Sequence, residues 1–220
     1  MPRLALSTDR VRRIYDRLGS WYDWGERFES AGKARAFERL EVAPGQRLLN
    51  VGAGTGLDHA RLRAAVAPDG MAVALDLSRV MLGLVRARTG APACQADAHQ
   101  LPFRDVSFDR LYCTYVLDLF PEPGLPDVLA EFRRVLKPGG RLVLVTLTEG
   151  VTTSSRLFIG VWKGAYAVSP VVCGGCRPVP LVPALEAAGL ALVSREVVVQ
   201  LGIPSQVVVA VRPSDGASPG

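Results

Sequence analysis

The sequence has 220 residues, of which 49% are hydrophobic and 21% charged, values typical of one globular domain. Its four cysteines are too few for a disulfide-stapled scaffold, and no run of about 18 uninterrupted apolar residues predicts a membrane span. The net charge of +5 permits contact with an anionic surface, but the basic residues are scattered without an RNA-binding motif, so we expect no nucleic-acid partner. Because no secretory signal is visible, a cytoplasmic protein is expected, with room for peripheral attachment to a membrane.

The first predicted element is an amphipathic helix over Ser7–Glu29. Several arginines surround a set of apolar residues that recur at helical spacing. The apolar residues are Val11, Ile14, Tyr15, Leu18 and Tyr22. A basic amphipathic helix of this kind packs on its domain, covers a substrate site or lies on a membrane surface. With a second helix over Ala31–Leu40, it forms an expected N-terminal helical cap, residues 1–46.

Residues 47–212 alternate between predicted strands and helices. The strands are expected over Arg47–Val51, Met71–Leu77, Pro92–Ala96, Phe108–Thr114 and Arg141–Leu147, and the helices over Leu57–Val66, Ser78–Arg88 (with Ser78 as N-cap) and Pro126–Leu136. This alternation is typical of βαβ units and of an α/β fold with a mainly parallel sheet.

The C-terminal part ends with a helix over Leu181–Ala188 and two closing strands, Leu190–Val199 and Gln206–Arg212. Their short link predicts antiparallel pairing at one edge of a seven-stranded sheet. The preceding segment, Gly150–Arg177, has no simple pattern, and we expect either a lid over a site or a structural excursion. Residues 213–220 are predicted to be a disordered tail.

The strongest functional signal is a glycine-rich turn that follows the first strand, in the run Leu48-Leu49-Asn50-Val51-Gly52-Ala53-Gly54-Thr55-Gly56. Glycines allow a tight turn and a close approach of the backbone to a ligand. The helix that follows offers free N–H groups to an anion. A P-loop would need Lys and Ser or Thr after the last glycine, and a nicotinamide fingerprint would need glycine at position 57, where leucine stands.

The spacing Gly-x-Gly-x-Gly instead resembles motif I of class I methyltransferases that use S-adenosyl-L-methionine. Asp76, at the end of the second strand, lies 24 residues after Gly52, where an acid can accept hydrogen bonds from ribose hydroxyls. The runs Ala74-Leu75-Asp76-Leu77-Ser78, Asp97-Ala98 with Leu101-Pro102-Phe103, and Lys137-Pro138-Gly139-Gly140 are similar to further family motifs. Capping of a helix is the alternative role for Asp76.

This resemblance covers about residues 47–147 and implies a Rossmann-like, doubly wound fold. By carry-over, Asp97 accepts the adenine amino group and the Ala98 backbone meets a ring nitrogen. The N-terminal run VRRIYDRLGSWYD resembles that of quinone-methylating and phospholipid-methylating relatives, which places Tyr15 and Tyr22 at the cofactor's methionine end, unless they are core aromatics. The full set of expected cofactor-binding residues is Tyr15, Tyr22, Gly52, Ala53, Gly54, Gly56, Asp76, Leu77, Met81, Asp97, Ala98 and Thr114.

Two features of the sequence are not explained by the resemblance to this methyltransferase family. Many relatives carry histidine after the fourth strand, whereas this chain has Asp118 there, which is either a catalytic polar group beside the transferred methyl or a helix-start aspartate. The pair Cys173 and Cys176 lacks the second pair that a structural zinc needs, so we expect no metal site.

The sequence therefore predicts an S-adenosyl-L-methionine-dependent methyltransferase that acts on a small, lipophilic acceptor, quinone-like or a phospholipid amine. The basic first helix suggests peripheral membrane contact. The alternatives are a non-catalytic module that binds the same cofactor and a nicotinamide-dependent oxidoreductase.

Overall fold

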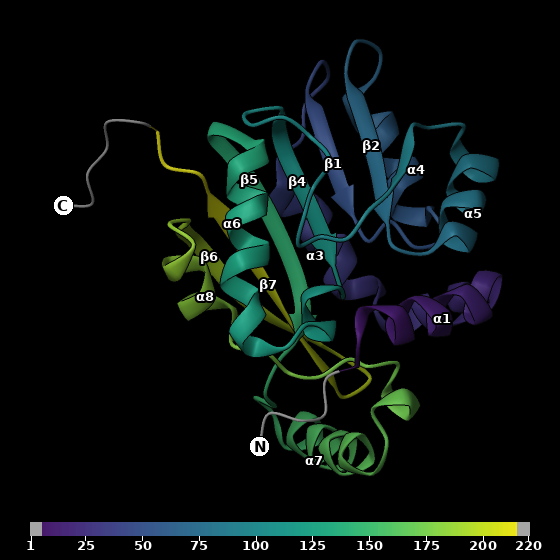
Figure 1. Ribbon diagram of the computed structural model, residues 1–220. Coiled ribbons are helices and arrows are strands. Elements are labelled where there is room, and N and C mark those ends of the chain that lie inside the picture. The colour runs from purple at the N-terminus through teal and green to yellow at the C-terminus, as the bar shows by residue number, and fades with distance from the viewer. Residues whose placement is uncertain (1–5, 215–220) are drawn as a thin grey trace.

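The computed structural model describes residues 6–214 and contains one seven-stranded sheet with helices on both faces (Figure 1). The strand order is β3-β2-β1-β4-β5-β7-β6. The strands are β1 (Arg47–Val51), β2 (Met71–Asp76), β3 (Ala93–Gln95), β4 (Phe108–Thr114), β5 (Leu136–Leu147), β6 (Ala191–Gln200) and β7 (Ile203–Val211). The first five are parallel, and β7 runs antiparallel to both β5 and β6. The predicted α/β class, with antiparallel pairing near one edge, is confirmed.

The helices divide between the two faces according to the alternation of side chains along the strands. They are α1 (Thr8–Leu18), α2 (Tyr22–Gly25), α3 (Ser30–Leu40), α4 (Leu57–Val66), α5 (Arg79–Thr89), α6 (Leu125–Val135), α7 (Thr153–Val168) and α8 (Leu181–Ala187). In β1, Leu48 packs into a cluster with α3 and α4, whereas Leu49 and Val51 pack into the cluster that contains α6 and α8. Both faces of the central strands are therefore buried, as a parallel sheet requires.

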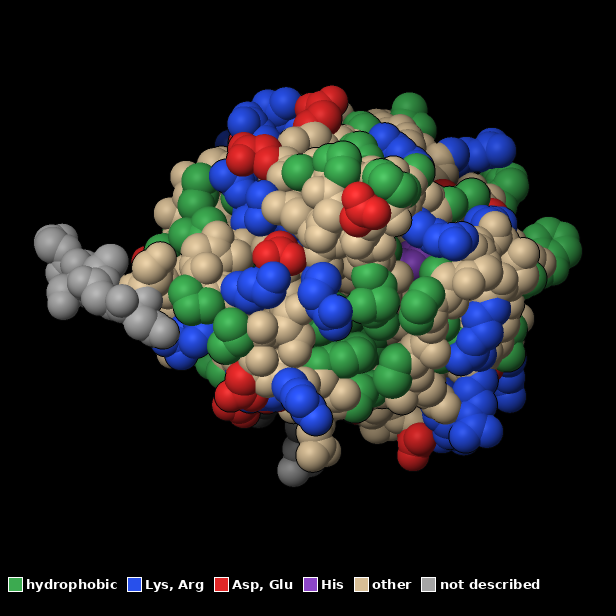
Figure 2. Space-filling model, turned by 90° about the horizontal axis from the view of Figure 1, so that it is seen from above, with side chains coloured by type: hydrophobic (Ala, Val, Ile, Leu, Met, Phe, Trp, Pro, Cys, Tyr) green, Lys and Arg blue, Asp and Glu red, His purple; other side chains and the backbone are tan. Residues whose placement is uncertain are grey.

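Short 3-10 turns join several of these elements at the carboxyl ends of the strands. They are η1 (Gly19–Trp21), η2 (Glu26–Phe28), η3 (Leu117–Leu119), η4 (Glu122–Gly124) and η5 (Pro170–Cys173). The face at the opposite, amino ends of the strands carries basic and acidic side chains that alternate with hydrophobic ones (Figure 2). The ion pairs Arg141–Glu41 and Lys137–Asp109 contribute to this mixed character.

The N-terminal helix is shorter than the expected Ser7–Glu29. α1 ends at Leu18, because Gly19 takes a positive φ of 48° that an α-helix cannot contain, and the chain continues through η1, α2 and η2. The predicted second helix is confirmed within one residue as α3.

The segment expected to be irregular, Gly150–Arg177, contains the 16-residue helix α7. It begins with a capping box in which Thr152 and Ser155 satisfy each other's backbone N–H groups. No helical period was visible because α7 is apolar on its exposed side as well as on its buried side.

Two further boundaries differ. The predicted helix Pro126–Leu136 and strand Arg141–Leu147 leave a turn between them, but β5 starts directly at Leu136, immediately after α6. β7 begins at Ile203, so the hairpin from β6 needs only Leu201 and Gly202. Of the expected disordered tail, residues 215–220 lie outside the described part of the chain.

Candidate functional site

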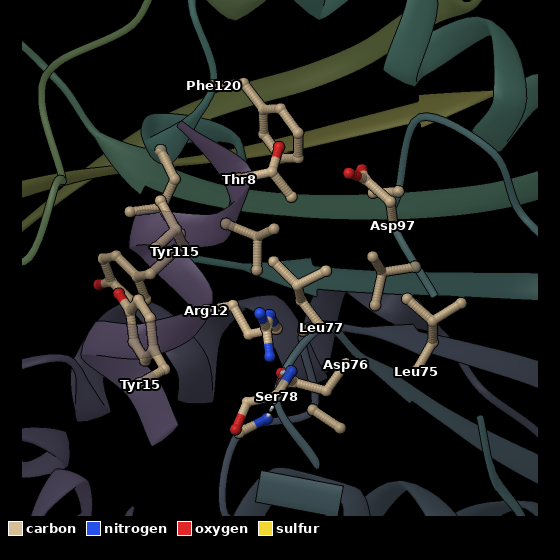
Figure 3. A pocket seen from close by; sticks show the side chains of 18 of the residues that line it. Thr8, Arg12, Tyr15, Leu75, Asp76, Leu77, Ser78, Asp97, Tyr115 and Phe120 are labelled. Atoms are coloured by element: carbon tan, nitrogen blue, oxygen red, sulfur yellow. Dashed lines mark hydrogen bonds between the residues drawn. The ribbon is translucent and has the colours of Figure 1, made fainter. Parts of the chain in front are cut away.

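A cavity of about 410 Å³ opens at the carboxyl ends of β1, β2 and β4. Figure 3 shows Asp76 and Asp97 on one side of it and Tyr15 and Tyr115 on another, with Arg12 between them. Its size lies within the range of about 300–1,000 Å³ that is common for small-molecule sites. Of the residues predicted from the sequence, it is lined by Tyr15, Tyr22, Gly52, Ala53, Gly54, Asp76, Leu77, Asp97, Ala98 and Thr114.

The glycine-rich turn forms the floor of this cavity. Gly52, Gly54 and Gly56 all have positive φ, at 72°, 53° and 88°. A Cβ on Gly54 would meet only the Tyr22 ring, at 3.7 Å, so the surface above this glycine is open. A Cβ on Gly52 would lie 2.1 Å from Val116 Cγ2, so this glycine lets the loop pass β4. The turn thus presents bare backbone to the cavity.

Two predicted site residues lie outside the lining. Gly56 starts α4, and a Cβ there would approach Val85 Cα at 3.0 Å, so it allows α4 and α5 to pack. Met81 is buried in α5 and its backbone N–H binds the capping Ser78. Both residues support the packing behind the glycine-rich loop and do not line the cavity.

Asp76 ends β2 with both carboxylate oxygens on backbone donors. The Gly54 N–H donates to Oδ2 and the Ser78 N–H to Oδ1, each at 2.9 Å. Burial nevertheless raises the pKa of Asp76 to about 6, against the effect of these two N–H groups. The carboxylate is fixed in place and keeps lone pairs for a ligand that donates hydrogen bonds.

Asp97 follows β3 at the neighbouring strand end. Its Oδ1 accepts from the His99 backbone N–H at 3.0 Å and lies 2.8 Å from His99 Nδ1. The His99 ring meets Phe120 edge to face at 4.8 Å between centroids. A flat apolar slot beside a carboxylate results, next to the buried Ala98.

At the other end of the cavity, Lys33 is surrounded by three carboxylates. Its Nζ lies 2.9 Å from Glu26, 3.1 Å from Glu29 and 3.7 Å from Asp58. These carboxylates raise the pKa of Lys33 although burial opposes them, and burial raises the pKa of Glu29. Lys33, Glu26 and Asp58 line the cavity, so this cluster presents more negative than positive charge to it.

Sequence analysis did not identify this cluster. One signal was available: Lys33 shares the apolar face of its helix with Ala36 and Leu40, at spacings of three and seven residues. A lysine on a buried face needs partners, because an unpaired buried charge is costly. The sequence could not say which acids would supply them.

Tyr115 was also missed, although it lies just after the predicted fourth strand. It has a φ of 55°, which is strained for a tyrosine, and its hydroxyl pairs with Ser205 Oγ at 2.8 Å. Tyr15 and Tyr22 stand 5.9 Å apart between ring centroids on the same wall, and Tyr22 donates to Glu29 at 3.3 Å. Together the three tyrosines make a half-polar wall opposite Asp76 and Asp97.

Asp118 lies in η3, behind this wall, and is not among the lining residues. Its side chain is fully buried; Oδ2 accepts a long bond of 3.4 Å from the Leu147 N–H, and Oδ1 has no partner among the described residues. Burial raises the pKa of Asp118 to about 7.

The two cysteines of the Cys173-Cys176 pair are free thiols with separate contacts. Cys176 Sγ lies 4.0 Å from the Tyr15 hydroxyl, and Cys173 Sγ lies 3.7 Å from the Trp162 carbonyl oxygen. Within residues 6–214 no group of three or more His, Cys, Asp or Glu side chains could hold a metal ion.

Comparisons with known proteins agree on one family. A family model described as a methyltransferase domain matches residues 49–144. The chain is 34% identical to the demethylmenaquinone methyltransferase of Symbiobacterium thermophilum over 70% of its own length and 65% of that protein. It is 30% identical to the 2-phytyl-1,4-naphtoquinone methyltransferase of Synechococcus elongatus over 78% of both chains. The chain thus spans less than two thirds of the first of these relatives.

The fold is shared with the geranyl diphosphate C-methyltransferase of Streptomyces coelicolor, whose crystal structure contains S-adenosyl-L-homocysteine. That structure matches with a TM-score of 0.65 and 15% identity over 85% of this chain and 80% of the other.

Proposed function

Because this chain belongs to the methyltransferase family, we propose that it binds S-adenosyl-L-methionine in the cavity and transfers its methyl group to a small lipophilic, quinone-like acceptor. The observation that carries the proposal is the pair of carboxylates at the ends of β2 and β3, with the open glycine turn beside them. Open α/β sheets bind nucleotides at this place, at the carboxyl ends of the strands.

The nucleoside part of the cofactor fits the side of the cavity that contains Asp76 and Asp97. Asp76 would accept hydrogen bonds from the ribose hydroxyls, since it lines the cavity and two backbone N–H groups hold its oxygens in place. Asp97 and the Ala98 backbone would hold the adenine edge, in the slot that Phe120 and His99 close. The bare backbone at Gly54 leaves room for the remaining chain of the cofactor.

The amino-acid part fits the opposite end. A sulfonium and an α-ammonium group are both cations, and the cluster of Glu26, Glu29 and Asp58 carries two negative charges more than Lys33 neutralises. Lys33 in turn can meet the α-carboxylate. Tyr15 and Tyr22 would pack against this end, and Gly56 and Met81 would support the loop from behind.

The transfer itself needs little from the protein beyond alignment and exclusion of water. The bound cofactor supplies a methyl group that its positive sulfur already activates. The chain aligns the two reactants, and alignment alone is worth on the order of 7–11 kcal/mol. Carbon methylation of a quinol also releases a proton. Asp118, whose pKa lies near 7, is a candidate acceptor only through the groups of the tyrosine wall, because its own side chain does not line the cavity.

A quinone-like acceptor is favoured over a phospholipid amine by the names of the two relatives and by the apolar lining beside the tyrosines. Val11, Leu119 and Phe120 contribute that lining. In this proposal residues 1–46 act as a cap over a core formed by residues 47–212. The exposed Arg10, Arg13 and Arg17 of α1 would contact anionic lipid at the cytoplasmic membrane surface.

The test is a calorimetric titration with S-adenosyl-L-homocysteine and, separately, with NADH, followed by incubation of the enzyme with labelled cofactor and a short-chain naphthohydroquinone. We expect saturable binding of the first compound only, and transfer of label to the ring carbon. Binding without product from any quinol would leave a non-catalytic module, and binding of NADH alone would support an oxidoreductase.

A further inference from the structure

Helix α7 carries an apolar face that no described part of the chain covers. Leu157, Val161 and Val168 are 71%, 67% and 88% exposed. They lie at i, i+4 and i+11, and the exposed Gly160 and Gly164 fall between them on the same stripe. We call these five residues the α7 face. The opposite side of the helix is buried through Ile159 and Tyr166.

Basic residues border this face. Arg156 and Lys163 lie seven residues apart on one side of it, and α7 contains no acidic residue. Lys163 is paired with Glu149, which precedes the helix, and both side chains remain more than half exposed. Apolar residues edged by Arg and Lys are the pattern of helices that lie in a membrane interface.

A further exposed apolar residue, outside α7, stands next to the helix. Leu201, at the tip of the β6–β7 hairpin, is 75% exposed and has a φ of 51°. The hairpin tip touches the first two turns of α7, since a Cβ on Gly202 would lie 3.8 Å from the Ser154 carbonyl oxygen and 3.9 Å from Phe158 Cβ. The hairpin tip thus adds an exposed leucine beside the N-terminal part of α7.

A lipid surface suits this face better than a second copy of the chain. A 16-residue helix is about 24 Å long and about 10 Å wide, so one face offers a few hundred Å², less than the roughly 800 Å² per partner of a stable interface. Pairing two such helices would also bring Arg156 and Lys163 of each copy together, whereas an anionic bilayer attracts them.

The buried side of α7 connects this face to the site. Trp162 donates its indole N–H to the Cys176 carbonyl at 2.9 Å, and the Cys176 thiol lies 4.0 Å from the Tyr15 hydroxyl. Tyr15 lines the cavity. In Figure 1, α7 lies at the carboxyl ends of the strands, the end of the sheet at which the cavity opens. A membrane on the α7 face would therefore be separated from the cavity wall by the width of α7 and by the chain around Cys176.

We propose that α7 is a membrane-docking helix, which inserts the α7 face into the interface of an anionic bilayer and holds the cavity at the surface where a lipophilic acceptor dissolves. The inference about the acceptor rests on the proposed function; the docking itself does not. α1 cannot insert in the same way, because its apolar residues Val11 and Tyr15 face the cavity, so it can add only charge.

The test is flotation of the full chain with vesicles of phosphatidylcholine and phosphatidylglycerol. The wild-type protein should float with these vesicles, and Leu157→Asp/Val161→Asp should lower the bound fraction at least about tenfold. Arg156→Gln/Lys163→Gln should weaken binding mainly at low salt. The control is Leu192→Asp/Val193→Asp on β6, which adds the same charge at two other exposed apolar residues and should float like wild type.

Circular dichroism and titration with S-adenosyl-L-homocysteine establish that each variant is folded. Wild-type protein that does not float, or α7 variants that float unchanged, would overturn the docking proposal, as would a concentration-dependent dimer that Leu157→Asp/Val161→Asp abolishes. Flotation of a protein that binds no S-adenosyl-L-homocysteine would instead count against the proposed function and leave the docking intact.

Discussion

The two walls of the cavity are built in opposite ways. On the glycine-loop side, Gly54, Asp76 and Asp97 lie at or within three residues of the ends of parallel strands, and backbone N–H groups hold both carboxylates. On the tyrosine side, Tyr15, Tyr22 and Tyr115 come from α1, α2 and the end of β4. Tyr15 and Tyr22 contact each other, and side chains distant in the sequence hold the hydroxyls of Tyr115 and Tyr15, namely Ser205 and Cys176. The first wall is rigid and polar, and the second is half apolar and assembled from distant segments.

This difference suggests a division of work. Backbone-held carboxylates keep their geometry without the ligand, which suits recognition of a constant nucleoside. A wall of side chains can adapt its shape, which suits the acceptor and the amino-acid end of the cofactor that would pack against Tyr15 and Tyr22. If so, changes on the glycine-loop side should alter cofactor affinity, and changes behind the tyrosine side should alter stability or turnover and leave cofactor affinity unchanged.

The largest effect is expected for Gly54→Val. The side chain would enter the cavity from a backbone at φ 53° and fill space that the cofactor needs. Overpacking alone costs about 1–3 kcal/mol, or about 5- to 150-fold in affinity, so the Kd for S-adenosyl-L-homocysteine should rise by about 100-fold, near the upper end of that range. Calorimetry measures this. Gly45→Val is the matched control, because Gly45 has a φ of 81° with nothing within 4 Å of its Cβ and lies outside the cavity lining. Equal losses in both variants would mean that strain, not the ligand, is responsible.

Asp76→Ala should come next. The ribose hydroxyls would lose an acceptor, and a hydrogen bond to a charged group is worth about 1.5–3 kcal/mol, so affinity should fall by about 10- to 100-fold. Asp109→Ala is the control, since that carboxylate also binds a backbone N–H, of Arg47 at 2.9 Å, and Lys137 at 2.7 Å, but outside the cavity. An unchanged Kd for Asp76→Ala would remove this residue from the site.

A smaller effect should appear with pH. The pKa of Asp76 is about 6 in the free protein, and a ligand that donates hydrogen bonds requires the charged form. Affinity should therefore be constant above pH 6 and fall as pH drops below it, approaching tenfold per pH unit, because Asp76 must first release a proton. Titrations between pH 5 and 8 measure the curve, and Asp76→Asn should bind weakly with no break near pH 6.

The smallest effect concerns the opposite wall. The pKa of Asp118 rises from 3.8 to about 7 on folding, so the folded protein binds more protons than the unfolded chain between these values. Its contribution to stability is full below pH 3.8 and is lost as pH rises through 7. Asp118→Asn, which imitates the protonated acid, should raise the Tm by about 2–4 °C at pH 8, by less at pH 5, and should change it little near pH 3.8.

Cofactor affinity of Asp118→Asn should equal that of the wild type, while methyl transfer to the quinol should slow if Asp118 takes the released proton. A weaker Kd for S-adenosyl-L-homocysteine in this variant would contradict the division between the two walls.

The strands of the sheet and the glycine-loop side of the cavity could be predicted from the sequence, because each depends on a pattern in consecutive residues. A buried strand, a glycine turn and a helix follow one another from Arg47 to Val66, and parallel strands bring their carboxyl ends to one edge. The sequence was insufficient for α7, because the exposed Leu157 and Val161 are apolar and no amphipathic period is visible. It also did not predict that the first helix ends at Gly19.

What the tertiary structure alone decided is which distant groups share a buried space. Lys33 meets Asp58 only because α3 and α4 pack on the same face of the sheet, and Tyr115 reaches Ser205 across 90 positions of the chain. The carboxyl of Asp118 has its raised pKa for the same reason, since burial is set by neighbours that η3 and β5 bring together. Local pattern fixes backbone conformation, whereas desolvation and charge pairing depend on long-range packing, which no short stretch of residues encodes.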